Sequence, residues 1–419
     1  FTPTDDNVYE GNETGIVAID TVSGGSANES GTPQVVTITI TENESAPTVT
    51  LATSATSIAE NAGSSLTLTA TLSVATTANV TVSLDGTGGT ATEGTDFGTV
   101  SDITISAGAT TGSTLFTVTD DSIYDATSNE TAGISISAVS GGGASENGNQ
   151  AVTITIIDNE SAPTLTLSTS ASSIAENAGS SLTLTATLSN GTYQDVTAAL
   201  GTSGTATEGT DYTDGSGNID DITISAGATT GTVSFTPTND SIVEADETAI
   251  IAVTGVSGGS ATESGSQSQT ITITNDDSSS FSVADVTVDE DAGTATVTVS
   301  ASNAFSSDVT IDFATSNGTA TAGSDYTATN GTLTFNAGDT SKTFSVSITD
   351  DSTDENNETI NITISNVSDG TISDSTGTIT ITDDDTPSLS INDVSTSDES
   401  NTATNMTVTL SDASTKTVT

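Results

Sequence analysis

The sequence lacks the residues on which most catalytic and recognition chemistry depends. Its 419 residues include no Cys, His, Arg or Trp, and only two Lys. Without His or Cys, the chain cannot form a catalytic triad, a zinc finger or a haem site. Nucleic acid is excluded as a partner, because its binding depends on Lys and Arg contacts to phosphate. Direct membrane insertion is not expected, since no apolar run approaches the roughly 20 residues of a spanning helix.

The scarcity of positive charge is extreme. The 56 Asp and Glu residues give the chain a formal net charge of −54 at pH 7. Like charges at this density push a compact state apart. The chain therefore needs a counter-charge from outside its own sequence, and a divalent cation is the first candidate.

Hydrophobic and aromatic residues are also scarce, at 32% and 3% of the chain. That composition alone would suit a disordered chain, but the pattern of residues overrules it. Residues 65–72 alternate apolar and hydroxyl side chains, as do residues 294–300 and 379–382. A period of two places apolar residues on one face of a strand and Thr or Ser on the other. The chain is predicted to be all-β.

Internal repeats define the expected domains. The motif SIAENAG at residues 57–63 returns at 173–179 and, more loosely, at 287–293. Several short strands with Gly-rich turns in each unit predict an Ig-like antiparallel β-sandwich. Short linkers predict an elongated rod of such units placed end to end. The expected domains are three full repeats, at 47–162, 163–279 and 280–386, the C-terminal part of a repeat at 1–46 and the N-terminal part of another at 387–419.

The last of these assignments depends on Asp398 and Glu399, which correspond to the region of Glu290 in the third full repeat. The partial repeats at both ends favour a window within a longer array.

The third full repeat is the richest in acids that fall at expected strand ends and in loops. Nine carboxylates could gather there at one end of a sandwich: Glu290, Asp325, Asp350, Asp351, Glu355, Glu358, Asp383, Asp384 and Asp385. Hard oxygen ligands in flexible loops suit Ca²⁺, which takes six to eight oxygens. Mg²⁺ ranks second because it demands stricter octahedral geometry.

The combined motifs resemble the Calx-beta domain, which is known from sodium–calcium exchangers and from large bacterial surface proteins. The resemblance rests on a Glu after the first strands, a Gly-x-Asp-Tyr/Phe loop, an Asp-Asp-x-x-x-Glu-x-x-Glu loop and a closing acidic triplet. It covers nearly the whole chain. It implies a two-sheet sandwich whose distal loops bind several calcium ions near the junction with the next domain.

The resemblance also implies ligands in the other repeats. In the second full repeat these are Glu176, Asp211, Asp240, Glu244, Glu247, Asp276 and Asp277. In the first they are Glu60, Asp96, Asp120, Asp121, Asp125, Glu130, Asp158 and Glu160. In the leading part they are Asp5, Asp6, Glu10, Glu13, Glu42 and Glu44. Because Asn239 and Asn275 lower the charge of the second repeat and the first has a longer acidic loop, we expect both to bind calcium ions more weakly, or to bind fewer of them, than the third.

These features predict a calcium-binding structural spacer in a long extracellular adhesin, fibre or surface-layer protein at the cell surface. Calcium would stiffen the domain junctions, and the expected partners are neighbouring repeats, with lateral or head-to-tail self-association. The alternative is a calcium-sensing regulatory module coupled to a partner. An enzyme is not expected: paired carboxylates could serve a glycosidase, but the acids recur in every repeat and no Trp is present to stack a sugar.

Overall fold

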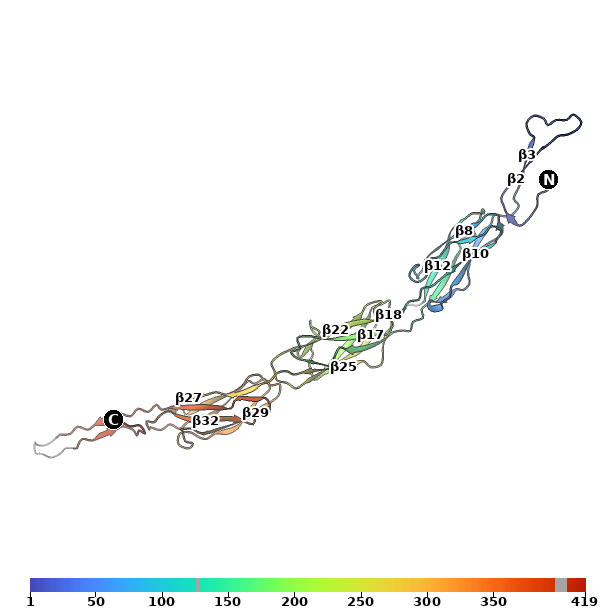
Figure 1. The fold of residues 1–419 in the computed structure, drawn as a ribbon. Helices are drawn as coiled ribbons and strands as arrows, with labels where there is room; N and C mark the ends of the chain where they lie inside the picture. Colours follow the sequence, from blue (N-terminus) through green and yellow to red (C-terminus); the bar gives the residue numbers. More distant parts are fainter. Residues whose placement is uncertain (126–128, 396–404) are drawn as a thin grey trace.

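The protein is an elongated rod of β-sandwiches that follow one another in sequence order (Figure 1). The computed structural model describes residues 1–125, 129–395 and 405–419, so Asp398 and Glu399 lie outside the described residues. The prediction of an all-β rod is confirmed. Within the described residues the only helical elements are two single 3₁₀ turns, η1 (Glu60–Ala62) and η2 (Glu290–Ala292).

Each full repeat contains two sheets, and those of the first repeat show the arrangement. One sheet has the order β10 (Thr111–Phe116), β6 (Leu66–Leu72), β4 (Thr48–Thr53) and β13 (Ser145–Glu146). The other has the order β5 (Ser57–Ala59), β14 (Ala151–Ile157), β12 (Glu130–Ser140), β8 (Val80–Gly89) and β9 (Ile103–Ile105).

The second and third repeats reuse this topology. The second has β20 (Tyr212–Thr213), β22 (Thr230–Pro237), β17 (Leu182–Leu188), β15 (Thr164–Thr169) and β24 (Thr262–Glu263) in one sheet. Its other sheet has β16 (Ser173–Ala175), β25 (Ser268–Thr274), β23 (Glu247–Ser257), β19 (Val196–Gly204) and β21 (Ile222–Ile224). The third has β31 (Ser341–Ser347), β28 (Thr294–Ala301), β26 (Ser280–Val283) and β33 (Thr371–Asp374), facing β27 (Val286–Asp289), β34 (Thr376–Thr382), β32 (Glu358–Ser365), β29 (Val309–Asn317) and β30 (Asn330–Phe335).

Strand pairing is mostly antiparallel, with one exception in each sheet. The short edge strands β5, β16 and β27 run parallel to β14, β25 and β34. Each of these parallel edges brings the second strand of a repeat beside its last. The start and the end of a repeat therefore meet at the same edge, and the Glu after the first strands comes close to the closing acids.

The alternating pattern explains the core. In β28 the apolar side chains of Ala295, Val297 and Val299 are buried, whereas Thr294 and Thr296 on the other face are exposed. Each full repeat has its own cluster of buried apolar residues. The rod therefore contains three separate hydrophobic cores, one inside the sandwich of each full repeat.

The two ends of the chain carry smaller pieces of sheet. In the leading part β1 (Val8–Tyr9) precedes the antiparallel pair β2 (Glu13–Ala18) and β3 (Val35–Ile40). After the third repeat, β35 (Leu389–Ile391) pairs antiparallel with β36 (Val408–Leu410).

Successive repeats touch through one recurring backbone contact. Tyr9 in β1 pairs with Thr76 in β7 (Ala75–Thr76), and Tyr124 in β11 (Ile123–Tyr124) pairs with Thr192 in β18 (Gly191–Thr192), both in parallel. Isolated parallel bridges join Val243 to Phe305 and Asp354 to Ser414 at the next two junctions. We call Tyr9, Tyr124, Val243 and Asp354 the bridging residues. The same acidic loop of each repeat therefore docks on the same loop of its successor.

None of the helices among residues 1–125, 129–395 and 405–419 has the length and apolar character required to span a membrane.

Removing a large core side chain should destabilise one repeat. Phe235 is fully buried and stacks on Tyr212 with ring centroids 4.7 Å apart. We expect Phe235→Ala to reduce the free energy of unfolding of the second repeat by about 3–5 kcal/mol, because it leaves a cavity. Chemical denaturation followed by circular dichroism measures this loss. Leu115→Ala, at a side chain that is 59% exposed, should cause little change, and an equal loss in both variants would contradict this description of the core.

Candidate metal centre

The third repeat gathers its acids into two groups at the end that faces the next unit. One oxygen from each of Glu290, Asp383 and Asp385 lies within 4.8 Å of the other two. The same holds for Asp325, Glu355 and Glu358. We call the first the edge group, because its members meet where β27 and β34 run side by side, and the second the loop group. Both are made of carboxylate oxygens alone.

Local structure places Glu290 at the start of the 3₁₀ turn η2, which Gly293 ends. Gly293 has φ +69°, the left-handed conformation that glycine adopts without strain. The turn stops β27 and holds the Glu290 side chain, only 8% exposed, against the closing triplet. The recurring Glu-x-Ala-Gly motif thus forms the turn that positions one carboxylate in the edge group.

The second repeat contains equivalent groups. Glu176, Asp240 and Asp277 form its edge group, and Asp211, Glu244 and Glu247 form its loop group. The backbone NH of Asp240 donates to Oε1 of Glu176 over 2.7 Å. Asp276, by contrast, accepts a hydrogen bond from the side chain of Asn177 and lies outside both groups.

The first repeat assembles an edge group from Glu60, Asp121 and Glu160. Its remaining predicted ligands, Asp96, Asp120, Asp125, Glu130 and Asp158, belong to no such group among the described residues, which omit 126–128 in the acidic loop. Asp96 and Glu130 are nevertheless neighbours, since burial first, and then the charge of Asp96 and its side-chain hydrogen bond, raise the pKa of Glu130. In the third repeat, Asp350, Asp351 and Asp384 likewise lie outside the two groups.

The leading part places its acids around one small cavity but does not form a group of three within the described chain. Asp5, Asp6, Glu10, Glu13, Glu42 and Glu44 all line this cavity. Glu42 has a structural part, because its carboxylate accepts hydrogen bonds from the backbone NH of Glu44, Glu10 and Gly11. These bonds, that of Glu44 foremost, lower the pKa of Glu42 to about 2.

In several loop acids, one carboxylate oxygen accepts a hydrogen bond from a backbone NH. Asp325 Oδ2 accepts from the NH of Thr321 over 2.7 Å, and Asp211 and Asp96 cap Thr207 and Thr92 in the same way. Such a cap fixes the side-chain direction before any ligand binds. The carboxylates are therefore oriented by the loops rather than left to move in solvent.

Burial and mutual repulsion make these glutamates hard to ionise. Burial, followed by the charge of Asp351, raises the pKa of Glu290 to about 7. Burial also raises the pKa values of Glu60, Glu130, Glu247 and Glu358 to about 7, assisted by neighbouring aspartates. Among the described residues, no Lys of the same repeat pairs with an acid of these groups.

A second observation shows that the edge groups fit a cation. Three buried side-chain oxygens have no hydrogen-bond partner within the described residues: Glu160 Oε2, Asp277 Oδ2 and Asp385 Oδ2. These are the last acids of the closing triplets in the three full repeats, and all belong to edge groups. An unpartnered buried carboxylate oxygen is costly, and a hard divalent cation with oxygen ligands would remove that cost.

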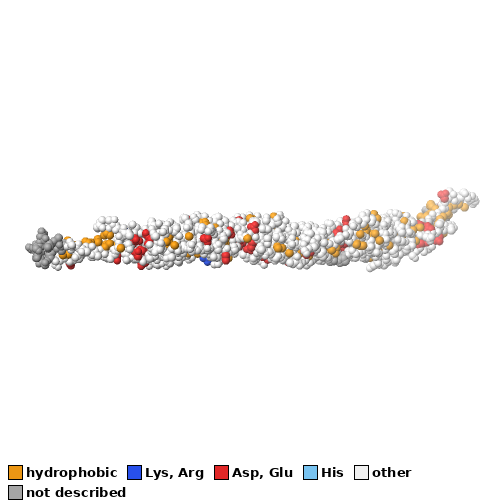
Figure 2. Space-filling model, turned by 90° about the horizontal axis from the view of Figure 1, so that it is seen from below, with side chains coloured by type: hydrophobic (Ala, Val, Ile, Leu, Met, Phe, Trp, Pro, Cys, Tyr) orange, Lys and Arg blue, Asp and Glu red, His pale blue; other side chains and the backbone are white. Residues whose placement is uncertain are grey.

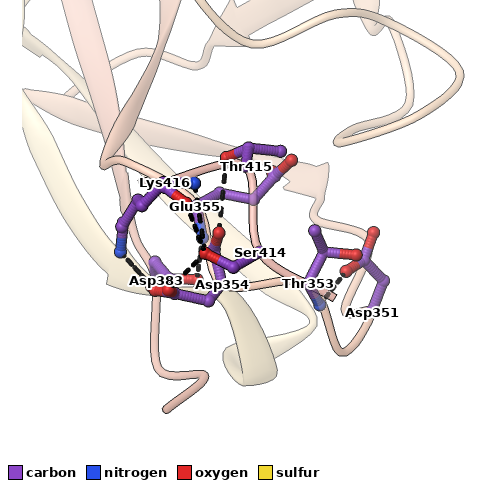
Figure 3. A network of polar contacts seen from close by, with 8 residues as sticks. All are labelled: Asp351, Thr353, Asp354, Glu355, Asp383, Ser414, Thr415 and Lys416. Carbon is purple, nitrogen blue, oxygen red and sulfur yellow. Dashed lines mark hydrogen bonds and ion pairs between the residues drawn. The ribbon is translucent and has the colours of Figure 1, made fainter. Parts of the chain in front are cut away.

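Sequence reasoning missed one ion-pair network at the end of the third repeat. Lys416 Nζ lies 2.5 Å from Asp354 Oδ1 and 2.9 Å from Asp383 Oδ2 (Figure 3). Two signals were available. Lys416 is one of only two cations in the chain, and Asp354 stands where the other repeats have Tyr or Val.

A family model supplies the comparison that the geometry invites. The model described as "Calx-beta domain" matches residues 2–44, 42–160, 158–278 and 273–385, which together are most of the chain.

The chain belongs to the Calx-beta family. Calx-beta domains are non-catalytic modules that bind calcium, and four of them follow one another here, the first matched only in part. The acidic groups described above are the residues that would hold the ions, which supply positive charge when bound.

Individual proteins are also similar to parts of this chain. Sodium/calcium exchanger 1 from Canis lupus familiaris and from Bos taurus are each 41% identical to this chain over 96 residues. That match covers 18% of this chain and only 10% of each exchanger. Among solved structures, the apo-form Calx CBD1 domain is 28% identical, with a TM-score of 0.25 over 26% of this chain and 100% of that one. CBD12 from CALX1.2 is 16% identical, with a TM-score of 0.25 over 52% and 99%.

The raised pKa values of glutamates in the edge and loop groups of these Calx-beta domains predict that low pH stabilises the calcium-free protein. For Glu290 and Glu358 the folded-state pKa of about 7 lies above the ordinary value of 4.5. Their stabilising contribution is complete below pH 4.5 and is lost as the pH rises through 7. In calcium-depleted buffer, the thermal midpoint measured by calorimetry should be higher at pH 5 than at pH 7.5.

Millimolar calcium should abolish or reverse this pH trend, because protons and calcium compete for the same oxygens. A calcium-free midpoint that rises from pH 5 to pH 7.5 would contradict the electrostatic description of the groups.

Charge differences between repeats predict unequal calcium affinities. The third repeat has Asp350 and Asp383 where the second has Asn239 and Asn275. We expect restoring acids with Asn239→Asp and Asn275→Asp to tighten calcium binding by the second repeat, by about tenfold for the pair. Isothermal titration of the full chain measures this change. Asn218→Asp/Ser266→Asp, which adds the same two charges in exposed loops of the same repeat, is the matched control, and an equal effect there would show that only overall charge matters.

Proposed function

We propose that this chain is a calcium-stiffened spacer segment of a long extracellular surface protein. One observation supports it above the others. At every junction the bridging residue that contacts the next unit is followed directly by a predicted ligand: Tyr9 by Glu10, Tyr124 by Asp125, Val243 by Glu244 and Asp354 by Glu355. The loop that would bind calcium is thus the loop that docks the neighbouring domain.

Hydrogen bonds tie this loop to the linker as well. The NH of Glu355 donates to Asp383 Oδ1 over 2.9 Å, and the NH of Glu244 donates to Asn275 Oδ1 over 3.4 Å. Asp383 and Asn275 begin the closing triplets, and each triplet continues straight into the linker. Cation binding in the edge and loop groups would therefore fix the docking loop and the linker together. Junctions would become stiff, and the rod would resist bending.

The setting is proposed from charge and repetition. Figure 2 shows acidic side chains gathered at intervals along the rod, between stretches of uncharged surface. A −54 chain would bind calcium most usefully where the ion is abundant, and extracellular modules work at about 10⁻⁴–10⁻³ M. We place the protein at the cell surface, in an adhesin, fibre or surface layer. Its partners would be neighbouring repeats, with lateral or head-to-tail association once calcium has reduced the repulsion between rods.

The similarity to sodium/calcium exchanger 1 favours a second candidate, a calcium-sensing module coupled to a partner. Both functions need calcium, but a sensor must pass a change of shape to another protein. A spacer needs only a change of stiffness.

The spacer function predicts that calcium lengthens and straightens the chain. Small-angle X-ray scattering of the full chain should give a larger maximum dimension in millimolar calcium than in chelator. Glu244→Gln/Glu247→Gln, in the loop group of the second repeat, should reduce this response by freeing one junction. The control Asp369→Asn/Asp374→Asn removes the same charge at exposed residues outside the groups, and it should respond like the unmodified chain.

Two results would count against the proposal. Identical scattering in calcium and in chelator would show that the junctions do not depend on the ion. Calcium binding without any length change, together with calcium-dependent capture of a partner protein, would favour the sensor.

A further inference from the structure

Lys416 provides a positive charge inside the last junction. Its ammonium lies 2.5 Å from Asp354 Oδ1 and 2.9 Å from Asp383 Oδ2 (Figure 3). The lysine follows β36, whereas both acids belong to the third repeat. Ser414 Oγ adds a hydrogen bond to Asp354 Oδ2 over 2.7 Å, and the backbone NH groups of Asp354 and Thr415 complete the contact between the two units.

Asp354 and Lys416, which form one of these ion pairs, occupy positions that hold uncharged residues at the other junctions. The bridging position held by Asp354 is Tyr9, Tyr124 or Val243 elsewhere. The position two residues beyond the bridge on the following unit, held here by Lys416, is Ala78, Gln194 or Ser307 at the other junctions. The only other lysine, Lys342, pairs with Asp339 within the third repeat. A fixed cation is therefore available to one junction alone.

The ammonium engages a predicted calcium ligand. Asp383 belongs to the edge group with Glu290 and Asp385. Its Oδ1 accepts the NH of Glu355 and its Oδ2 faces Lys416, so both oxygens are occupied. The side chains of Asp383 and Asp354 are only 7% and 14% exposed. Partly buried charges of this kind are screened by salt much less than charges in open solvent.

We infer that Lys416 acts as a built-in counter-cation that keeps the last junction docked without calcium and lowers the calcium affinity of the third repeat. The ammonium neutralises part of the charge for which calcium would otherwise be needed. A divalent ion that enters the edge group must share Asp383 with the Lys416 ammonium. Two positive charges bound to the same carboxylate repel each other. Lys416 is thus a positioning residue for the junction and an antagonist of the ion. This inference rests on the proposed calcium binding.

Distances between spin labels test the docking. The chain has no Cys, so Thr334→Cys and Thr409→Cys place one label on the third repeat and one on β36, both at exposed residues. In chelator the distance distribution should be narrow in the parent chain. It should broaden in Lys416→Met and narrow again in millimolar calcium. Lys342→Met, which removes an identical charge away from the junction, should stay narrow, and Lys416→Arg should retain most of the narrowing.

Terbium luminescence tests the antagonism. Replacing Tyr9, Tyr124, Tyr193 and Tyr212 with Phe leaves Tyr326, next to Asp325, as the only tyrosine able to sensitise bound Tb³⁺. The Tb³⁺ concentration that half-saturates this luminescence in the calcium-free chain then reports the ion affinity of the third repeat. We expect Lys416→Met to lower that concentration about tenfold, whereas Lys342→Met should leave it unchanged.

The outcomes separate the inference from the proposed function. A narrow distribution of Lys416→Met in chelator would show that the lysine does not hold the junction. A Tb³⁺ midpoint that is unchanged or higher in this variant would reduce Lys416 to a structural contact and overturn the antagonism. Absence of Tb³⁺ and calcium binding in every chain would instead reject the proposed calcium function itself.

Discussion

The mutual repulsion of carboxylates held at the strand ends is the constraint on which the rest of the structure depends. The sandwich cores bring Glu290, Asp383 and Asp385 within a few ångströms, and their charges oppose that placement. Each core can hold the groups in place because the parallel edge fixes the second and last strands of a repeat side by side. Folding thus fixes the positions of the carboxylates in each group and leaves their negative charge unbalanced within the group.

The acids divide their work between shaping the loops and leaving oxygens available. Asp351, Asp240 and Asp121 each accept the backbone NH two residues further on, and this holds the turn that leads to the bridging residue. The last acids of the triplets do the opposite, because one buried oxygen of each has no partner among the described residues. The first kind of acid has a backbone partner even where it belongs to an edge group, as Asp121 and Asp240 do, whereas the second kind leaves a buried oxygen that an ion would satisfy. The high acid content is therefore not uniformly a metal-binding signal.

Much of the fold followed from the sequence, because alternation and repetition are local signals. The pattern at residues 294–300 predicted β28 and its buried face, and the recurring motifs predicted acids at equivalent strand ends. Pairing between distant segments carries no such signal. The parallel edges and the bridge between Asp354 and Ser414 depend on contacts far apart in the chain. The division of the acids into edge and loop groups needed this pairing, and the backbone-capping part of Glu42 needed the loop geometry.

The junctions combine a constant backbone contact with variable side chains. The parallel bridge recurs at all four junctions, so the path of the rod is set by the backbone. The side chains that reach across differ: Tyr193 donates from its hydroxyl group to Asp121 at one junction, and Lys416 pairs with Asp383 at another. Both reach a carboxylate of an edge group, one as a neutral donor and one as a full charge. A neutral donor leaves the negative charge of the edge group almost unchanged, whereas an ammonium neutralises part of that charge. Under the proposed calcium function, changes at one or two positions beside the bridge would set the cation dependence of each junction separately, without altering the sandwich that carries it.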